Sequence, residues 1–323
     1  MTPTFPHLHL HRFRAMGSEM GVWLQLADGD AAEGLLRGAA ALFDEAERRL
    51  SRFDPDSELS RLNERPDEWV EVSRLLWRVV TSALQLAEET DGLFDPTLLD
   101  AMLTAGYDRP FDPAWRGGNG HVAANAPPLF GQWQLVERDG ARRALRLSHG
   151  ARLDLGGIAK GFTARQVVDW LSVWGPCLVD AGGDLSAGDG PAGESGWPVA
   201  VAAPSGMTAG DTPDRPALHL WLSNATLATS GVDYRWWLSG GRRHHHVIDP
   251  RTGRAAETDL LTATVLSADA ARAEAWATAL LVAGQTTALY RADQHDLPVA
   301  LFAADGRLSL TPALGRLIVD EPS

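Results

Sequence analysis

One short stretch of the sequence combines glycines, a carboxylate and a lysine: LDLGGIAKGF, residues 153–162. Lys160 is the only lysine in the chain, since all the other residues among the 29 lysines and arginines are arginine. Lysine is a compact point charge on a flexible stem, whereas arginine is a broad planar fork. A double glycine between a strand and a helix allows backbone N–H groups to face a phosphate at close range. The stretch indicates a phosphate site, although the Walker A and G-x-G-x-x-G spacings are absent; the alternative is a lysine without a special role.

A second stretch, RHHHVIDPRTGR at residues 243–254, contains a turn and three adjacent histidines. His246 stands three residues before Asp249, so it could be a general base that a neighbouring carboxylate holds in place. A histidine near a turn is more often structural. The histidine trio could also bind a transition metal without any functional role.

A third stretch, AEAWATAL at residues 273–280, carries two oxygen ligands at helical spacing. Glu274 and Thr278 are four residues apart and therefore lie on one face of a helix. One carboxylate and one hydroxyl, together with a backbone carbonyl from a glycine loop, form a hard oxygen site that suits Mg²⁺. Taken alone, such a pair is usually found at a helix surface or cap.

Two further segments could face a ligand. ATLATSGVDYRWW, residues 225–237, has small hydroxyl residues before a glycine, which is typical of a tight ligand-facing loop or of simple ST-turns. GLFDPTLLD, residues 92–100, places Phe94 beside a carboxylate and a proline turn. Its ring could pack on a planar ligand or belong to the core.

The elements that position these residues follow from the hydrophobic pattern. Alternation predicts a strand at residues 19–27, and an apolar stripe predicts a helix from about 31 to 50. Ser73 is a predicted N-cap for a helix that ends at Glu89. Further helices are expected after Gly157 and over the alanine-rich residues 269–284.

Strands are expected at 132–137, 143–148, 177–181, 197–203, 218–223, 245–249, 262–267, 297–303 and 307–311. Loops are expected at 51–63, 108–128 and 204–216. Strands outnumber helices and few of them alternate with helices, which favours an α+β architecture over a doubly wound sheet.

Composition excludes some classes of function. The 323 residues are 45% hydrophobic, enough for a full core, and the net charge of −13 argues against non-specific nucleic-acid binding. The single cysteine, Cys177, cannot form an internal disulfide. No apolar run reaches membrane-spanning length, and the opening residues are too polar for a signal peptide. We therefore expect a cytoplasmic protein, unless a leader has been removed from the sequence.

Taken in order, eight segments resemble the FAD:protein FMN transferases, also called the ApbE family. The segments are FRAMGSEM, SRFDPDSELSRLN, GLFDPT, LDLGGIAKGF, VDAGGDL, ATSG, HHHVIDPRTG and AEAWATAL. Each one alone is a weak signal, but the ordered set covers nearly the whole chain. The resemblance implies a single α+β domain over residues 1–323, related to the tunnelling fold.

The resemblance also implies an activity. Family members cleave FAD at its pyrophosphate, transfer FMN to a threonine or serine hydroxyl of a partner protein and release AMP. Some members mainly hydrolyse FAD to FMN and AMP. The implied partners are FAD, Mg²⁺ and an acceptor protein with a short Asp-Gly-x-Thr-type motif. Residues 258–264 of this chain, TDLLTAT, lack the glycine and read as a core strand, so we do not expect self-modification.

The resemblance implies three groups of site residues: a catalytic base, metal ligands and FAD-binding residues. His246 is the expected catalytic base for the acceptor hydroxyl. Metal ligands are expected from the carbonyl of Gly157 and from the side chains of Glu274 and Thr278. The FAD-binding positions are Met16, Phe53, Leu93, Phe94, Asp95, Asp154, Lys160 and Ile248.

Two positions depart from the family pattern. The family usually has aspartate where this chain has Glu274, which is one methylene longer, and it often has tyrosine where this chain has Phe53. Mg²⁺ demands octahedral metal–oxygen distances of about 2.1 Å. Because the glutamate is longer, we expect weaker Mg²⁺ binding, or Ca²⁺ or Mn²⁺ in place of Mg²⁺. The alternatives to a transferase are therefore an FAD pyrophosphatase and a non-catalytic FAD-binding protein.

Overall fold

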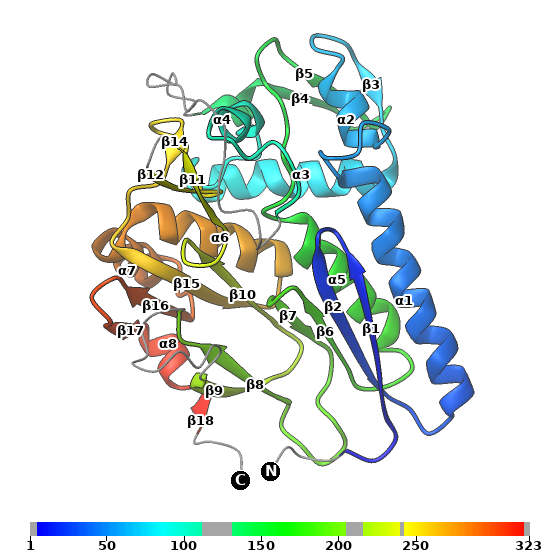
Figure 1. Cartoon of the computed structure of the whole chain (residues 1–323). Helices are drawn as coiled ribbons and strands as arrows, with labels where there is room; N and C mark the ends of the chain where they lie inside the picture. The colour runs from blue at the N-terminus through cyan, green and yellow to red at the C-terminus, as the bar shows by residue number, and fades with distance from the viewer. Residues whose placement is uncertain (1–4, 112–130, 205–215, 240–241, 320–323) are drawn as a thin grey trace.

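A large antiparallel sheet forms the centre of the computed structural model, which describes residues 5–111, 131–204, 216–239 and 242–319. The sheet has eight strands in the order β1-β2-β6-β7-β10-β15-β16-β17 (Figure 1). These strands are β1 (Leu8–Ala15), β2 (Ser18–Gln25), β6 (Cys177–Ala181), β7 (Leu185–Ala187), β10 (Thr226–Gly231), β15 (Leu260–Ser267), β16 (Val299–Ala303) and β17 (Leu308–Leu310).

Both faces of this sheet are covered, as the alternation along β6 shows. Cys177 and Val179 pack with apolar residues of the helices α1 (Gly29–Leu50) and α5 (Ala159–Leu171). Leu178, which points the other way, packs with a three-stranded sheet in the order β18-β9-β8. That sheet consists of β8 (Trp197–Ala202), β9 (Pro216–Leu222) and β18 (Ile318–Val319), and the short helix α8 (Pro312–Gly315) packs beside it. The result is a helix layer, a large sheet and a small sheet.

Helix α6 (Ala270–Ala283) is the most deeply buried helix among those described, because its alanines let it pack closely on β10 and β15. A helix that is apolar on all sides belongs in a core. Glu274 and Thr278 project from this helix. Glu274 is buried, so its carboxylate is shielded from water even without a ligand.

Smaller elements surround the end of the sheet near which the site residues gather. They are α2 (Glu58–Asn63), β3 (Val70–Glu71), α3 (Arg74–Glu89), α4 (Leu99–Thr104), β4 (Val136–Asp139) and β5 (Ala144–Leu147), with a 3₁₀ turn at Gln132–Leu135. Two short hairpins, β11 (Trp236–Ser239) with β12 (Arg242–His245) and β13 (Ile248–Asp249) with β14 (Arg254–Ala255), complete this part (Figure 1). Helix α7 (Gln285–Gln294) packs beside α6 and β16 instead.

The predicted helices and most of the predicted strands are confirmed. Ser73 is the N-cap of α3, where its hydroxyl accepts the N–H of Leu76 at 3.2 Å. Gly92 follows the end of α3 with a positive φ of 75°, the left-handed conformation that glycine adopts readily. The α+β architecture is also confirmed.

Several local predictions were wrong. The edge strand β1 at residues 8–15 was not predicted at all, because one of its faces is open to solvent and its composition is polar. The predicted loop at 51–63 contains α2, capped by Ser57, and the predicted strand at 132–137 begins as a 3₁₀ turn. Residues 226–231 are the strand β10 and not a loop. The predicted loops at 108–128 and 204–216 lie largely outside the described residues.

Candidate active site

The glycine-rich stretch forms a tight turn that leads directly into α5. Asp154 shapes this turn, because its Oδ1 atom accepts the N–H of Gly156 at 2.6 Å. Helix α5 then begins at Ala159, so Lys160 lies in its first turn. The sequence prediction of a glycine turn followed by a helix start is confirmed.

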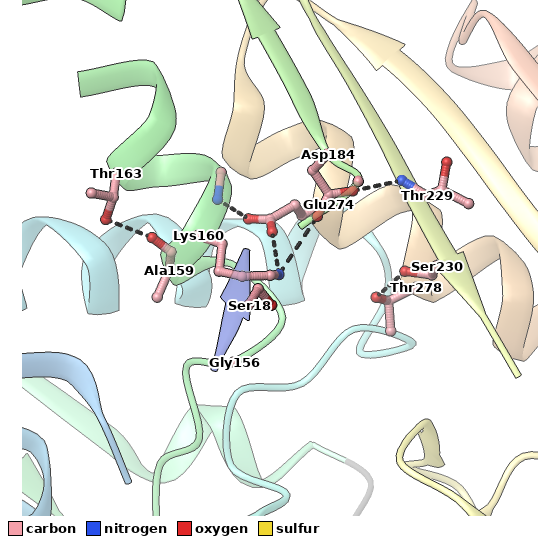
Figure 2. Close-up of polar contacts among 12 residues, drawn as sticks. Ser18, Gly156, Ala159, Lys160, Thr163, Asp184, Thr229, Ser230, Glu274 and Thr278 are labelled. Atoms are coloured by element: carbon pink, nitrogen blue, oxygen red, sulfur yellow. Dashed lines mark hydrogen bonds and ion pairs between the residues drawn. The ribbon is translucent and has the colours of Figure 1, made fainter. Parts of the chain in front are cut away.

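Lys160 is held between two carboxylates (Figure 2). Its Nζ atom lies 3.4 Å from Oε1 of Glu274 and 3.5 Å from Oδ2 of Asp184. The other oxygen of Glu274 accepts the N–H of Gly161 at 2.9 Å, and the other oxygen of Asp184 accepts the N–H of Thr229 at 2.8 Å. The cluster therefore ties α5 to α6 and to the strand β10.

This arrangement depends on the glycine at position 161. A Cβ atom there would lie 2.6 Å from Oε2 of Glu274, so a larger residue would push the carboxylate away. Burial raises the pKa of Glu274 to about 7, although the nearby ammonium of Lys160 acts in the opposite direction. For Lys160 burial favours the neutral amine, but the carboxylates of Glu274 and Asp184 outweigh it and raise its pKa.

The candidate metal ligands are hard oxygen donors. Thr278 lies one turn after Glu274 on α6, and its hydroxyl is 2.9 Å from that of Ser230 (Figure 2). The described residues contain no group of three or more His, Cys, Asp or Glu side chains that could hold a metal. A cation here would therefore depend on hydroxyl and carbonyl oxygens beside the carboxylate of Glu274, a donor set that fits Mg²⁺ or Ca²⁺.

Asp154 meets a buried arginine that the sequence did not point to. Nε of Arg52 lies 2.5 Å from Oδ2 of Asp154, and both side chains are less than a tenth exposed. The guanidinium of Arg52 lies over the ring of Phe53, 4.0 Å from its centroid. Phe53 itself is partly exposed to solvent.

The segment GLFDPT packs under the glycine turn. Leu93 and Phe94 are buried in the main core, and a Cβ atom at Gly157 would lie 3.3 Å from the Phe94 ring. Oδ1 of Asp95 accepts the backbone N–H of Thr97 at 2.8 Å and the Thr97 hydroxyl as well. Its Oδ2 is buried without a hydrogen-bond partner among the described residues, and burial raises the pKa of Asp95 to about 6.

His246 lies between β12 and β13, beside Tyr107. Its Nδ1 is 3.5 Å from the carbonyl oxygen of Arg235, and the two ring centroids of His246 and Tyr107 are 6.2 Å apart. The expectation that Asp249 holds His246 was wrong, because Asp249 binds the guanidinium of Arg251 at 2.9 Å. Burial, and next the charge of Arg235, lower the pKa of His246 to about 3.

Met16 and Ile248 lie on two different hairpins. Met16 has a φ of 50° in the turn between β1 and β2, which is uncommon for a residue other than glycine, and Glu47 accepts its N–H at 2.9 Å. Ile248 is buried in an apolar cluster with Tyr107 and Trp237.

Comparison with known proteins identifies the group of proteins to which this site belongs. A sequence model of the ApbE family matches residues 16–302. The chain belongs to the ApbE family. It is 33% identical over 259 residues to the FAD:protein FMN transferase of Treponema pallidum, covering 75% of this chain and 69% of the relative. It is 28% identical to the FAD:protein FMN transferase of Salmonella typhimurium over 262 residues, or 80% of this chain and 73% of the relative.

Solved structures of ApbE proteins have the same fold. The apo flavinyl transferase ApbE of Pseudomonas stutzeri superposes with a TM-score of 0.81 at 26% identity, covering 98% of both chains. The ApbE protein of Thermotoga maritima superposes with a TM-score of 0.85 at 22% identity, covering 97% of this chain and all of the other. No helix in the described part of the chain is long and apolar enough to cross a membrane.

Some residues of this ApbE site were not singled out from the sequence. Asp184, the second carboxylate at Lys160, is the second-last residue of the quoted segment VDAGGDL, where an acid after a double glycine was the available signal. Arg52 and Arg235 had no such signal, because the chain is rich in arginine and only the fold brings these two to Asp154 and His246.

Proposed function

We propose that this chain transfers FMN from FAD to a threonine or serine hydroxyl of an acceptor protein and releases AMP. The observation that carries the proposal is the placement of the only lysine. Lys160 lies in the first turn of α5, directly after the glycine turn, in a chain of the ApbE family. Positive charge and helix N-terminal amides are what a pyrophosphate requires.

Glu274, the Thr278 hydroxyl and the Gly157 carbonyl are the groups that would hold a divalent cation, with Mg²⁺ as the expected ion. When bound, such an ion neutralises negative charge on the pyrophosphate and polarises the reacting phosphorus. Its ligand set supports a hard cation because every proposed donor is an oxygen. The Glu274 carboxylate also contacts Lys160. It would therefore lie next to both positive charges that the pyrophosphate would meet, the Lys160 ammonium and the metal ion.

His246 would accept the proton of the acceptor hydroxyl. A carbonyl oxygen only accepts hydrogen bonds, so Nδ1 of His246 must carry the proton that faces Arg235. That tautomer leaves the lone pair on Nε2. With a pKa of about 3 the ring is neutral at physiological pH but only a weak base, so the negative charge of the bound pyrophosphate must raise this pKa for the ring to accept the proton.

In the proposed reaction the acceptor oxygen forms a bond to the phosphorus of the FMN half, and the bond from that phosphorus to the bridging oxygen breaks. AMP leaves with the bridging oxygen, and the hydroxyl proton passes to Nε2 of His246. Burial of Lys160 and Glu274 supports this chemistry, because charge interactions are stronger where water is excluded.

Chromatographic analysis of the products tests the proposal. The protein is incubated with FAD and Mg²⁺, with and without a domain that carries an acceptor threonine. We expect AMP together with protein-bound flavin only when the acceptor is present. Free FMN with an unmodified acceptor would instead indicate an FAD pyrophosphatase, and intact FAD would indicate a binding protein.

A further inference from the structure

We propose that Arg52 is a positioning residue that fixes the glycine turn and the wall beside His246 in one arrangement. The inference rests on the proposed function, since it concerns the same FAD site. Arg52 lies just beyond the end of α1, in the segment SRFDP, and its side chain is only 6% exposed. A buried guanidinium is rare unless its charge and its donors are satisfied.

The edge of the guanidinium joins two segments that are far apart in the sequence. Nε binds Oδ2 of Asp154 at 2.5 Å, and Nη2 donates to the carbonyl oxygen of Tyr107 at 2.8 Å. The other oxygen of Asp154 accepts the N–H of Gly156. Arg52 therefore reaches, through one carboxylate, the turn that precedes Lys160.

The plane of the guanidinium contacts two aromatic rings. Its central carbon lies 4.0 Å from the ring centroid of Phe53 and 4.7 Å from that of Tyr107. The Tyr107 ring stacks on Trp237 at 5.5 Å and also faces the His246 ring. Through Tyr107, Arg52 supports the side of the site on which the proposed base lies.

These contacts require an arginine. A planar guanidinium can stack on rings with its faces and donate hydrogen bonds from its edge at the same time, whereas an ammonium cannot. The position thus contrasts with Lys160, where a point charge sits between two carboxylates. Removing the Arg52 charge would leave the Asp154 carboxylate buried and unpaired, which is strongly destabilising.

The test is a set of variants that separates positioning from simple charge pairing. Arg52→Met, Asp154→Asn and the double variant are compared with the wild type for thermal unfolding, FAD affinity and turnover. Arg48→Met, which removes an exposed ion pair with Glu45 in the last turn of α1, is the matched control. Arg52→Lys keeps the charge but loses the stacking.

We expect Arg52→Met to weaken FAD binding by about tenfold or more and to lower kcat as well, because both sides of the site are loosened. Asp154→Asn should mainly raise KM. The double variant should recover the thermal stability that Arg52→Met loses, since no unpaired carboxylate remains, and should bind FAD no more weakly than the worse single variant. Arg52→Lys should not restore kcat.

Native FAD affinity and kcat in Arg52→Met would overturn the inference, as would losses that simply add in the double variant. A wild-type protein that binds no FAD would overturn the proposed function instead. In that case a crystal structure of the double variant still tests whether Arg52 positions the Tyr107 ring and the Gly156 turn. We expect a displaced Tyr107 ring and Gly156 turn, and unchanged positions of both would contradict the inference.

Discussion

The Nζ atom of Lys160, on α5, lies 3.4 Å from Oε1 of Glu274, on α6, across 114 residues of sequence. One carboxylate is therefore both the counter-ion of the only lysine and the proposed ligand of a cation. The glutamate is long enough to reach the N–H of Gly161 and the lysine together. The length of the glutamate at this position thus has a structural use in this chain.

Replacement of the lysine tests its role toward the substrate. Lys160→Met should raise the Kd for FAD roughly 10- to 100-fold, because a charge-assisted hydrogen bond contributes about 1.5 to 3 kcal/mol. Flavin fluorescence titration measures the change. Arg165→Met, which removes an ion pair with Asp169 on the same helix, is the control, and its FAD affinity should stay native. An unchanged Kd for Lys160→Met would remove the lysine from the substrate site.

A methyl group at position 161 tests the Glu274 contact. A Cβ atom on Gly161 would lie 2.6 Å from Oε2 of Glu274, so Gly161→Ala should displace the carboxylate. We expect weaker Mn²⁺ binding by electron paramagnetic resonance and a lower unfolding temperature. Gly34→Ala, where the Cβ meets nothing within 4 Å, should instead stabilise α1 by about 0.5 to 1 kcal/mol. If Gly161→Ala binds Mn²⁺ like the wild type, Glu274 is not a ligand.

His246→Ala separates binding from transfer. FAD affinity should stay within about twofold of native, while the transfer rate should fall roughly 10²- to 10⁴-fold, the usual contribution of a general base. Stopped assays with labelled FAD measure the rate, and His244→Ala, two residues earlier on β12, is the control. Normal transfer by His246→Ala would show that another group is the base.

Asp95 predicts a pH dependence of stability with a definite sign. Its pKa in the folded protein is raised from 3.8 to about 6, so its stabilising contribution is full below pH 3.8 and is lost as the pH rises through 6. The Asp95→Asn variant has no carboxyl group to titrate at this position, so its stability does not fall in this way as the pH rises. Its free energy of unfolding relative to wild type should therefore rise by about 1 to 3 kcal/mol between pH 4 and pH 7.

Urea unfolding at both pH values measures the difference. Asp91→Asn is the matched control, because the Asp91 side chain is exposed on the same loop, where it pairs with Arg291. A difference between Asp95→Asn and wild type that does not change with pH would show that the Asp95 carboxyl titrates at its ordinary pKa in the folded protein.

Local pattern was sufficient to predict much of the fold. The amphipathic stripes of α1 and α3 and the alanine run of α6 have strong helical periodicity, and each helix lies within two residues of its predicted bounds. The polar edge strand β1 and the short helices α4 and α7 were missed, because tertiary pairing or packing decides them.

The candidate site was predictable only in part. Lys160 was evident from composition and Glu274 from helical spacing, but their contact depends on how α5 and α6 pack. Sequence proximity suggested Asp249 as the partner of His246, whereas the turn chemistry of DPRTG directs Asp249 to Arg251. Burial, which sets the pKa of His246, cannot be read from a polar-looking segment such as RHHHV.

The most direct test of the central claim is the intact mass of an acceptor domain after incubation with this protein, FAD and Mg²⁺. Transfer of FMN predicts a mass gain equal to FMN less one water, one AMP released per modified acceptor, and no gain with the His246→Ala variant. An acceptor of unchanged mass, with FAD consumed or intact, would contradict the assignment of this chain as an FMN transferase.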